Sequence, residues 1–220
     1  MPKPTFFNLP AAKRQRITEL AVEEFATHPY RQASLSNIVA RAGIAKGSIY
    51  QYFDDKQDLY RWLVMDVAYE QQVAHIRAYV QATPADFYVY LQQVTLAGLR
   101  FYSQFPRLGR LLAGVLELSA DPELAPLCKQ IRQQSYQWCC SVLEQAIQHG
   151  HVRSDLKIDV AAHLVTAALG EGTTYLLLDR LNTDLGTALH HPERLEPIED
   201  EVLEALVEDI VSILRRGLHP

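Results

Sequence analysis

Apolar residues recur at intervals of three and four along almost the whole chain, whereas the strict alternation typical of strands is nearly absent. Prolines, glycines and capping residues divide this pattern into segments. We expect about nine helices, over residues 10–26, 35–42, 46–53, 56–81, 84–104, from 106 onward, 121–150, 158–181 and 197–216, with a polar loop at about 182–196. The periodicity therefore predicts an all-α fold.

The composition fits an ordinary globular protein. Hydrophobic residues make up 48% of the 220 residues and charged residues 21%, which excludes a mainly disordered chain. Three cysteines, two of them adjacent (Cys139 and Cys140), form neither a disulfide framework nor a metal-ligand spacing, which indicates a reducing cytoplasm. No apolar run reaches the ~18 residues of a membrane helix, and residues 1–10 do not resemble a signal peptide. We therefore expect a cytoplasmic protein with no membrane partner.

The net charge of -5 is unevenly distributed along the chain. Residues 1–60 hold eight basic and six acidic side chains, whereas the other 160 residues hold 13 basic and 20 acidic ones. Such a split is compatible with two parts that have different tasks, and also with chance placement of solvated charges.

The segment from Ser34 to Leu59 contains two short predicted helices that meet at Ala42-Gly43-Ile44. Ser34 can cap the first helix, and Gly43 suits the left-handed conformation at its end. Apolar residues face inward from both helices: Leu35, Ile38 and Val39 from the first, Ile49 and Phe53 from the second. This arrangement predicts a helix-turn-helix.

The exposed face of the second helix is expected to carry Lys46, Ser48, Tyr50, Gln51 and Tyr52. Such side chains can contact phosphates and base edges, and a glycine at position 47 would let the backbone approach DNA. From the pattern alone, a helical hairpin with solvated polar residues remains an alternative.

The run AGIAKGSIYQYFDDKQDLY resembles the signature of TetR-type bacterial transcriptional regulators. The matching positions are Ser34, Ile38, Ala42, Gly43, Ile44, Lys46, Gly47, Ser48, Ile49, Tyr50, Phe53 and Lys56, and the match covers about residues 10–60. Val39 stands where the family usually has Ala, and Ala45 stands where a capping Ser is frequent. Loss of such a cap typically costs about 1 kcal/mol.

The resemblance implies a DNA-binding domain at residues 1–54 and a helical ligand-binding and dimerisation domain at residues 55–220. By the same resemblance, Ser34 caps its helix and touches phosphate, and Lys46, Gly47 and Ser48 enter the major groove. Gln51 is the candidate for adenine recognition, since an amide can pair bidentately with that base. Tyr50, Tyr52 and Lys56 are expected to hold the DNA backbone.

The resemblance also implies a cavity for a small, largely apolar ligand of unknown identity, although for any single one of the large side chains core packing is the better interpretation. The expected lining residues are Trp62, Met65, Tyr69, Tyr90, Val94, Phe101, Tyr102, Leu112, Leu116, Trp138, His163 and Glu171. Ligand binding would move the helix that begins at Lys56 and release a palindromic operator.

The last two long helices are expected to pair across a two-fold axis in a homodimer, unless their apolar faces only complete the core. The expected interface residues are Ala161, Leu164, Ala168, Gly172, Leu176, Leu203, Leu206, Ile210 and Leu214. A dimer would set two reading helices about 34–36 Å apart, one turn of DNA.

Two other classes of function are weaker interpretations of the sequence. An all-helical enzyme would need a catalytic motif, and the chain has no phosphate loop, nucleophile elbow or metal-ligand spacing. The histidine pairs His149/His151 and His190/His191 lack a zinc signature, so we expect no metal and no cofactor other than the effector. A ligand-independent interaction module would not explain the segment from Lys46 to Tyr52.

Overall fold

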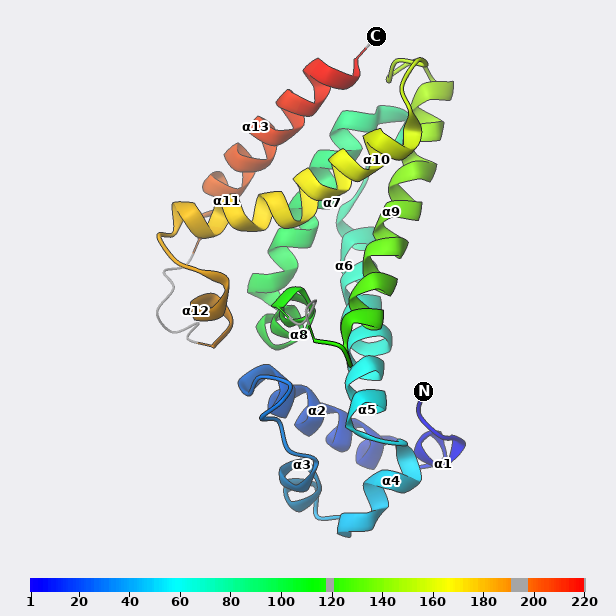
Figure 1. Cartoon of the computed structure of the whole chain (residues 1–220), viewed down its shortest axis with the longest axis vertical. Helices are drawn as coiled ribbons and strands as arrows, with labels where there is room; N and C mark the ends of the chain where they lie inside the picture. Colours follow the sequence, from blue (N-terminus) through cyan, green and yellow to red (C-terminus); the bar gives the residue numbers. More distant parts are fainter. Residues whose placement is uncertain (118–120, 191–197, 220) are drawn as a thin grey trace. The chain divides into compact units, whose positions relative to one another are not determined.

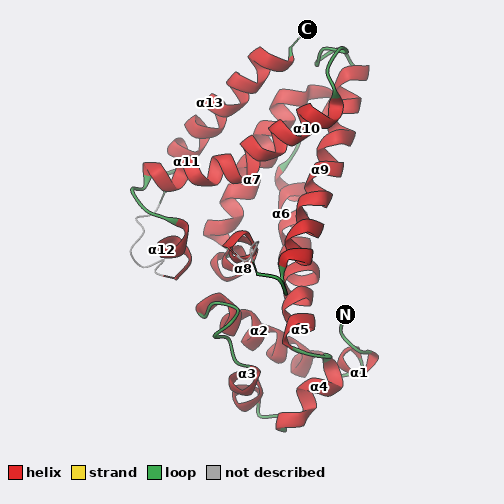
Figure 2. Ribbon diagram, in the orientation of Figure 1, coloured by secondary structure: helices red, strands yellow, loops and turns green. Residues whose placement is uncertain are grey.

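The computed structural model describes residues 1–117, 121–190 and 198–219. Every regular element within these ranges is helical, as Figure 2 shows, which confirms the all-α prediction. The α-helices are α1 (Pro4–Phe7), α2 (Ala11–Thr27), α3 (Leu35–Ala42), α4 (Ile49–Tyr52), α5 (Lys56–Trp62), α6 (Glu70–Tyr79), α7 (Phe87–Gln104), α8 (Pro106–Glu117), α9 (Ala125–Gln148), α10 (Ile158–Ala167), α11 (Thr173–Arg180), α12 (Leu185–His190) and α13 (Asp200–Leu218).

Several of these helices are extended by other helical turns. A 3₁₀ turn, Lys46–Ser48, leads into α4, and another, Pro84–Asp86, leads into α7. A π-helical segment, Leu63–Tyr69, joins α5 to α6, and a second, Ala168–Gly172, joins α10 to α11. The periodicity predicts each of these long helices as one uniform element, because a π-turn shifts the apolar pattern by only a fraction of a turn.

Two short helices lie where the sequence does not predict one. The polar composition of residues 182–196 predicts a loop, which is wrong for α12: the Asp184 carboxylate accepts hydrogen bonds from the Thr187 N–H (2.9 Å) and hydroxyl (2.8 Å). Such a cap starts a helical turn in polar sequence. Helix α1 has Pro4 at its first position and exists because Phe6, fully buried, anchors it. The expected start of the last helix at Pro197 falls outside the described residues.

The chain forms two compact units (Figure 1). The first comprises Met1–Val73 with Phe101–Cys128, and the second comprises Ala74–Arg100 with Lys129–Pro220. The domain boundary between residues 54 and 55 stays a prediction, because a packing unit and a functional domain need not coincide.

The core of the first unit holds the short helices in place. Large side chains with at most 1% exposure include Phe6, Ile17, Leu20, Ile38, Ile49, Phe53, Leu59 and Leu63. They come from α1 to α5 and the adjoining turns, so four-residue helices that would be unstable alone are stabilised by burial of their apolar faces.

The core of the second unit lies among α7, α9, α10 and α13. Phe87, Leu91, Leu143, Ala162 and Val207 are buried there with at most 1% exposure. At its edge the Arg215 guanidinium lies 4.7 Å from the ring centroid of Tyr88.

Within the described ranges, no helix is both long enough and apolar enough to cross a membrane.

Candidate nucleic-acid interface

The turn between α3 and α4 has the geometry that the sequence predicts. Gly43 is left-handed (φ 64°, ψ 31°), and its N–H donates to Ala40 O while the Ile44 N–H donates to Val39 O. Residues with a side chain rarely adopt this φ, so glycine is strongly favoured at this position. Val39 and Ile49 are buried and fix the second helix against the first. Leu35, expected to face inward, is half-buried.

A buried carboxylate supports the start of α3. Glu24 is 3% exposed, and its Oε1 accepts hydrogen bonds from the Ser34 N–H (2.8 Å) and the Asn37 side-chain amide (3.3 Å). Ser34 in turn caps α3, because its Oγ accepts from the Asn37 N–H at 3.4 Å. The capping role expected for Ser34 is thus confirmed. Glu24 itself was missed, although an acid on an otherwise apolar face of α2 is a signal for such a role.

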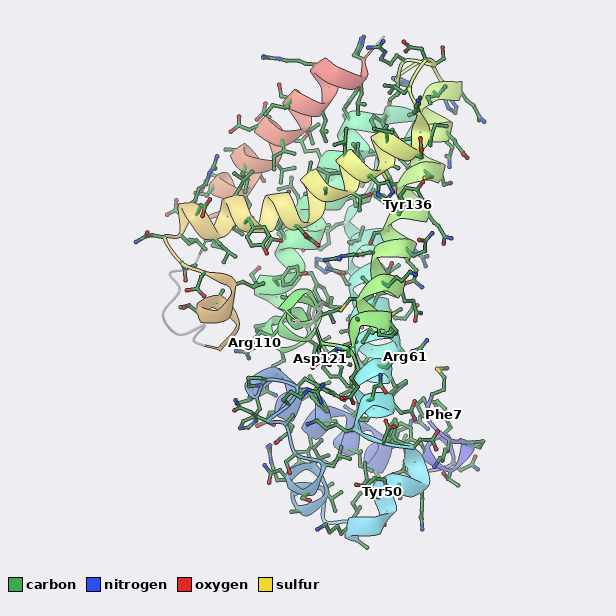
Figure 3. All side chains as sticks on the ribbon, in the orientation of Figure 1. Phe7, Tyr50, Arg61, Arg110, Asp121 and Tyr136 are labelled. Carbon is green, nitrogen blue, oxygen red and sulfur yellow. The ribbon has the colours of Figure 1, made fainter. Side chains whose placement is uncertain are left out.

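The second helix of the pair, made of the turn Lys46–Ser48 and α4 and called here the reading helix, has one face open to solvent. Lys46, Gly47 and Gln51 are exposed, Tyr50 is 53% exposed and Ser48 is half-buried. Figure 3 labels Tyr50 on α4. A Cβ built at Gly47 would meet no atom within 4 Å, so nothing in the described part of the protein requires a glycine there. These side chains offer a cation, hydroxyls and an amide, the groups that contact phosphates and base edges.

The expected exposure of Tyr52 is wrong. Its side chain is only 6% exposed and its ring lies 5.9 Å from that of Phe6. The prediction did not include α1, which covers this side of the short helix. Tyr52 therefore belongs to the core of the first unit and not to the surface that faces DNA.

Lys56 is engaged within the protein. Its Nζ donates to Arg31 O at 3.3 Å and lies 4.8 Å from the ring centroid of Tyr30. Partial burial lowers the pKa of this amine. The resemblance implies a phosphate contact for Lys56, but such a contact would require the amine to give up these partners, so we propose instead that Lys56 holds the Arg31 loop.

An ion-pair cluster ties the loop after α2 to the segment before α9. The Arg31 guanidinium donates two hydrogen bonds to Asp121 (2.8 and 2.7 Å) and lies 2.8 Å from Glu123 Oε2. The Tyr30 hydroxyl donates to Glu123 Oε1 at 2.5 Å, and the Gln57 amide donates to Glu123 O. The Arg31 hydrogen bonds lower the pKa of Asp121. Asp121, labelled in Figure 3, was interpreted from sequence only as part of a helix start; pairs 90 residues apart leave no sequence signal.

The expected ligand-lining residues in the first unit have different surroundings. The ring centroid of Trp62 lies 5.1 Å from that of Phe6 and 5.5 Å from that of Phe53. These two rings account for the burial of Trp62 without a ligand. Phe101 is fully buried with its ring 5.0 Å from Phe105. Met65, Tyr69 and Leu112 are half-buried, Tyr102 is 39% exposed, and the side chain of Leu116 lies outside the described residues.

The expected ligand-lining residues of the second unit lie on α7, α9, α10 and the following π segment. The rings of Tyr90 and Trp138 are 6.2 Å apart, and Val94 is half-buried. His163 stacks on Tyr136 at 4.4 Å, and Glu171 Oε1 pairs with Arg132 at 2.8 Å. Nearby on α9, the buried Gln134 Oε1 accepts no hydrogen bond from the described residues. Sequence reasoning missed this amide.

The expected dimer residues divide into two groups. Ala161, Leu203, Leu206 and Ile210 are buried within the single chain, whereas Leu164 (64%) and Leu176 (46%) are exposed, and Ala168, Gly172 and Leu214 are half-buried. Three exposed apolar residues on the same helices were not predicted: Val160, Tyr175 and Ile213. Val160, Leu164 and Ile213 line one groove between α10 and α13. No group of three potential metal-ligating side chains occurs within the described ranges.

Comparisons with known proteins agree with this geometry. Residues 17–62, which enclose the helix-turn-helix, match the family described as bacterial regulatory proteins, tetR family. The crystal structure of a TetR family transcriptional regulator from Chloroflexus aurantiacus J-10-FL is 32% identical, covers 100% of this chain and 99% of that chain, and has a TM-score of 0.71.

Two further relatives are more distant. The probable acrEF/envCD operon repressor of Escherichia coli (strain K12) is 24% identical over 177 residues, which is 78% of this chain and 79% of that protein. The transcriptional regulator FadR from Bacillus subtilis, solved in complex with stearoyl-CoA, is 23% identical, has a TM-score of 0.65 and covers 93% of this chain and 99% of that chain. At this identity the second likeness shows the fold alone.

Proposed function

The chain belongs to the TetR family of bacterial transcriptional regulators, and from this premise we propose that it represses transcription by binding a palindromic operator as a homodimer. A small, largely apolar ligand releases it from DNA. The operator-binding part is residues 1–54, and residues 55–220 bind the ligand and the second subunit. We assign the protein no catalytic activity, and we place it in the cytoplasm, where a bacterial chromosome is accessible.

The open face of the reading helix carries the proposal. Lys46 and Ser48 are exposed or half-exposed donors for phosphate, and Gln51 can pair with the major-groove edge of adenine. Tyr50 and Ser34 add contacts to the DNA backbone. Gly47 supports this assignment because the described protein leaves open space where a side chain at that position would lie.

The exposed apolar residues of α10, α11 and α13 support self-association. Val160, Leu164, Tyr175, Leu176 and Ile213 are between 46% and 71% exposed in the single chain. Three of them, Val160, Leu164 and Ile213, line one groove between α10 and α13, and exposed apolar residues grouped in this way are typical of a subunit interface. Dimerisation also strengthens DNA binding, because a single DNA-binding domain of slight positive charge binds DNA poorly at physiological salt.

The second unit offers polar groups that can orient a ligand. Gln134 Oε1 is buried without a hydrogen-bond donor among the described residues, so a ligand hydroxyl or amide is a suitable partner. The related structure with stearoyl-CoA makes a fatty acyl thioester the first ligand to test. We expect the added ligand to release the operator in proportion to the fraction of protein that it occupies. Unchanged operator affinity at a saturating ligand concentration contradicts the ligand proposal.

The DNA-binding proposal is tested with Gly47→Ala. We expect the variant to keep the stability of the parent, because the added methyl meets nothing in the described protein and alanine favours helix. Its affinity for the DNA upstream of its own gene, measured by mobility shift, should fall at least about tenfold, about 1.4 kcal/mol. Gly98→Ala is the matched control, since a Cβ there also meets no atom within 4 Å but lies on α7. Equal affinity of parent and Gly47→Ala contradicts the assignment.

A further inference from the structure

The N-terminal segment is anchored beside the reading helix by one aromatic side chain. Phe6 of α1 has no exposed surface. The centroid of its ring lies 5.0 Å from the ring centroid of Phe53, 5.1 Å from that of Trp62 and 5.9 Å from that of Tyr52. These three partners lie at the end of α4 and on α5. The segment before α2 is therefore held against the C-terminal end of the reading helix.

Three hydrogen bonds join this segment to consecutive carbonyls of α4. The Lys3 N–H donates to Tyr52 O at 2.8 Å, and the Lys3 Nζ donates to Tyr50 O at 2.8 Å. The Thr5 hydroxyl donates to Gln51 O. The last carbonyls of a helix have no partner within the helix, so side chains, water or other backbone groups must satisfy them. Here a segment about 46 residues earlier in the chain supplies the donors.

The charge of Lys3 also matches its position. Its ammonium forms an ion pair with Asp54 at 2.8 Å and lowers the pKa of that carboxyl. A cation at the C-terminal end of a helix is favourable because the carbonyls there carry partial negative charge. Helix α4 has only four residues, so its own hydrogen bonds hold it weakly and external contacts determine its orientation.

We propose that the segment from Lys3 to Phe6 is a clamp that orients the reading helix, with Lys3 and Thr5 as positioning residues for operator recognition. The backbone carbonyls of Tyr50 and Gln51 are held by the clamp, while the side chains of these two residues are exposed for DNA. The clamp restricts Gln51 to the orientation that pairs with a base edge. Contacts to phosphate do not depend on the identity of the base. A helix that is oriented less precisely can therefore still make them. This inference rests on the proposed function.

The test replaces Thr5 by valine, which keeps the shape of the side chain and removes the hydroxyl donor. We expect affinity for the operator to fall about three- to tenfold, whereas affinity for random duplex and the salt dependence stay unchanged. Thr27→Val is the matched control, since it removes a hydroxyl that donates to a carbonyl, Glu23 O at 2.8 Å, within α2. The control should keep full preference for the operator.

Lys3 gives a second test with a rescue. Lys3→Met should lower operator preference in the same way, and Lys3→Arg should restore it, because arginine can still donate to Tyr50 O and pair with Asp54. If Lys3→Met instead weakens operator and random duplex equally and reduces the salt slope, the ammonium contacts phosphate directly and the clamp is overturned.

A measurement on the free protein separates the clamp from the proposed function. Amide hydrogen exchange over residues 49–53 should be faster in Thr5→Val than in the parent and in Thr27→Val, whether or not DNA is bound. If the parent shows no preference for any duplex, the proposed function fails while this measurement still tests the clamp. Unchanged exchange, or faster exchange together with unchanged operator preference, overturns the clamp.

Discussion

Two lysines of the DNA-binding region provide a sharp test of which side chains contact DNA phosphate, because their surroundings in the structure differ. Lys46 is exposed and forms no hydrogen bond or ion pair with the described residues, whereas the Lys56 Nζ is 3.3 Å from Arg31 O and 4.8 Å from the centroid of the Tyr30 ring. We predict that Lys46→Met removes one phosphate contact per subunit and Lys56→Met removes none.

The size of the effect follows from counterion release. Each neutralised phosphate contributes about -0.9 to the slope of log K against log salt, so two Lys46 residues in a dimer contribute about -1.8. Over a fourfold rise in salt, from about 50 to about 200 mM, the parent should therefore lose about 12-fold more affinity than Lys46→Met. Operator and random duplex should be affected alike.

The assay is fluorescence anisotropy with operator and random duplexes at several salt concentrations. Lys56→Met should keep the parental salt slope, and its cost should be in stability, about 1–2 kcal/mol for the lost cation–π contact with Tyr30 and the lost hydrogen bond together. A reduced slope in Lys56→Met, or an unchanged slope in Lys46→Met, would refute this reasoning.

Three further predictions concern folding and assembly. Glu24→Ala leaves the half-buried Ser34 N–H without its acceptor and should lower the free energy of unfolding by about 1–3 kcal/mol, whereas Glu24→Gln keeps an acceptor and should cost less; equal costs in urea unfolding would be inconsistent with the cap. Arg31 lowers the pKa of Asp121, so this carboxylate stabilises the fold above its unfolded pKa of about 3.9 and the contribution is lost as pH falls through the lower folded value. Asp121→Asn should therefore lose less stability than the parent on acidification, and identical pH profiles would contradict the pair. Leu164→Glu should convert the proposed dimer to a monomer in analytical ultracentrifugation without lowering helical content, because Leu164 is 64% exposed; a persistent dimer would exclude this face as the interface.

Local signals in the sequence were sufficient to predict the helix-turn-helix. Gly43, the Ser34 cap and the buried Ile38, Val39 and Ile49 all act within a few residues of one another. Their roles follow from backbone conformation and helical periodicity, which a single sequence displays.

The contacts that the sequence did not reveal join residues far apart in the chain. Lys3 and Thr5 reach carbonyls of α4, and Arg31 reaches Asp121. Because α1 was not predicted, Tyr52 was expected on the exposed face that Phe6 covers. Hydrogen bonds between such distant segments depend on tertiary packing, which periodicity does not encode.

The central claim is that two symmetric copies of the helix near Lys46 read the major groove of one operator. Methylation interference at guanine N7, an atom of the major groove, tests this claim most directly. We predict two clusters of interfering guanines on one side of the duplex, about 10–10.5 base pairs apart from centre to centre. A single cluster, or binding that is insensitive to methylation at guanine N7 throughout a guanine-containing operator, would contradict the account.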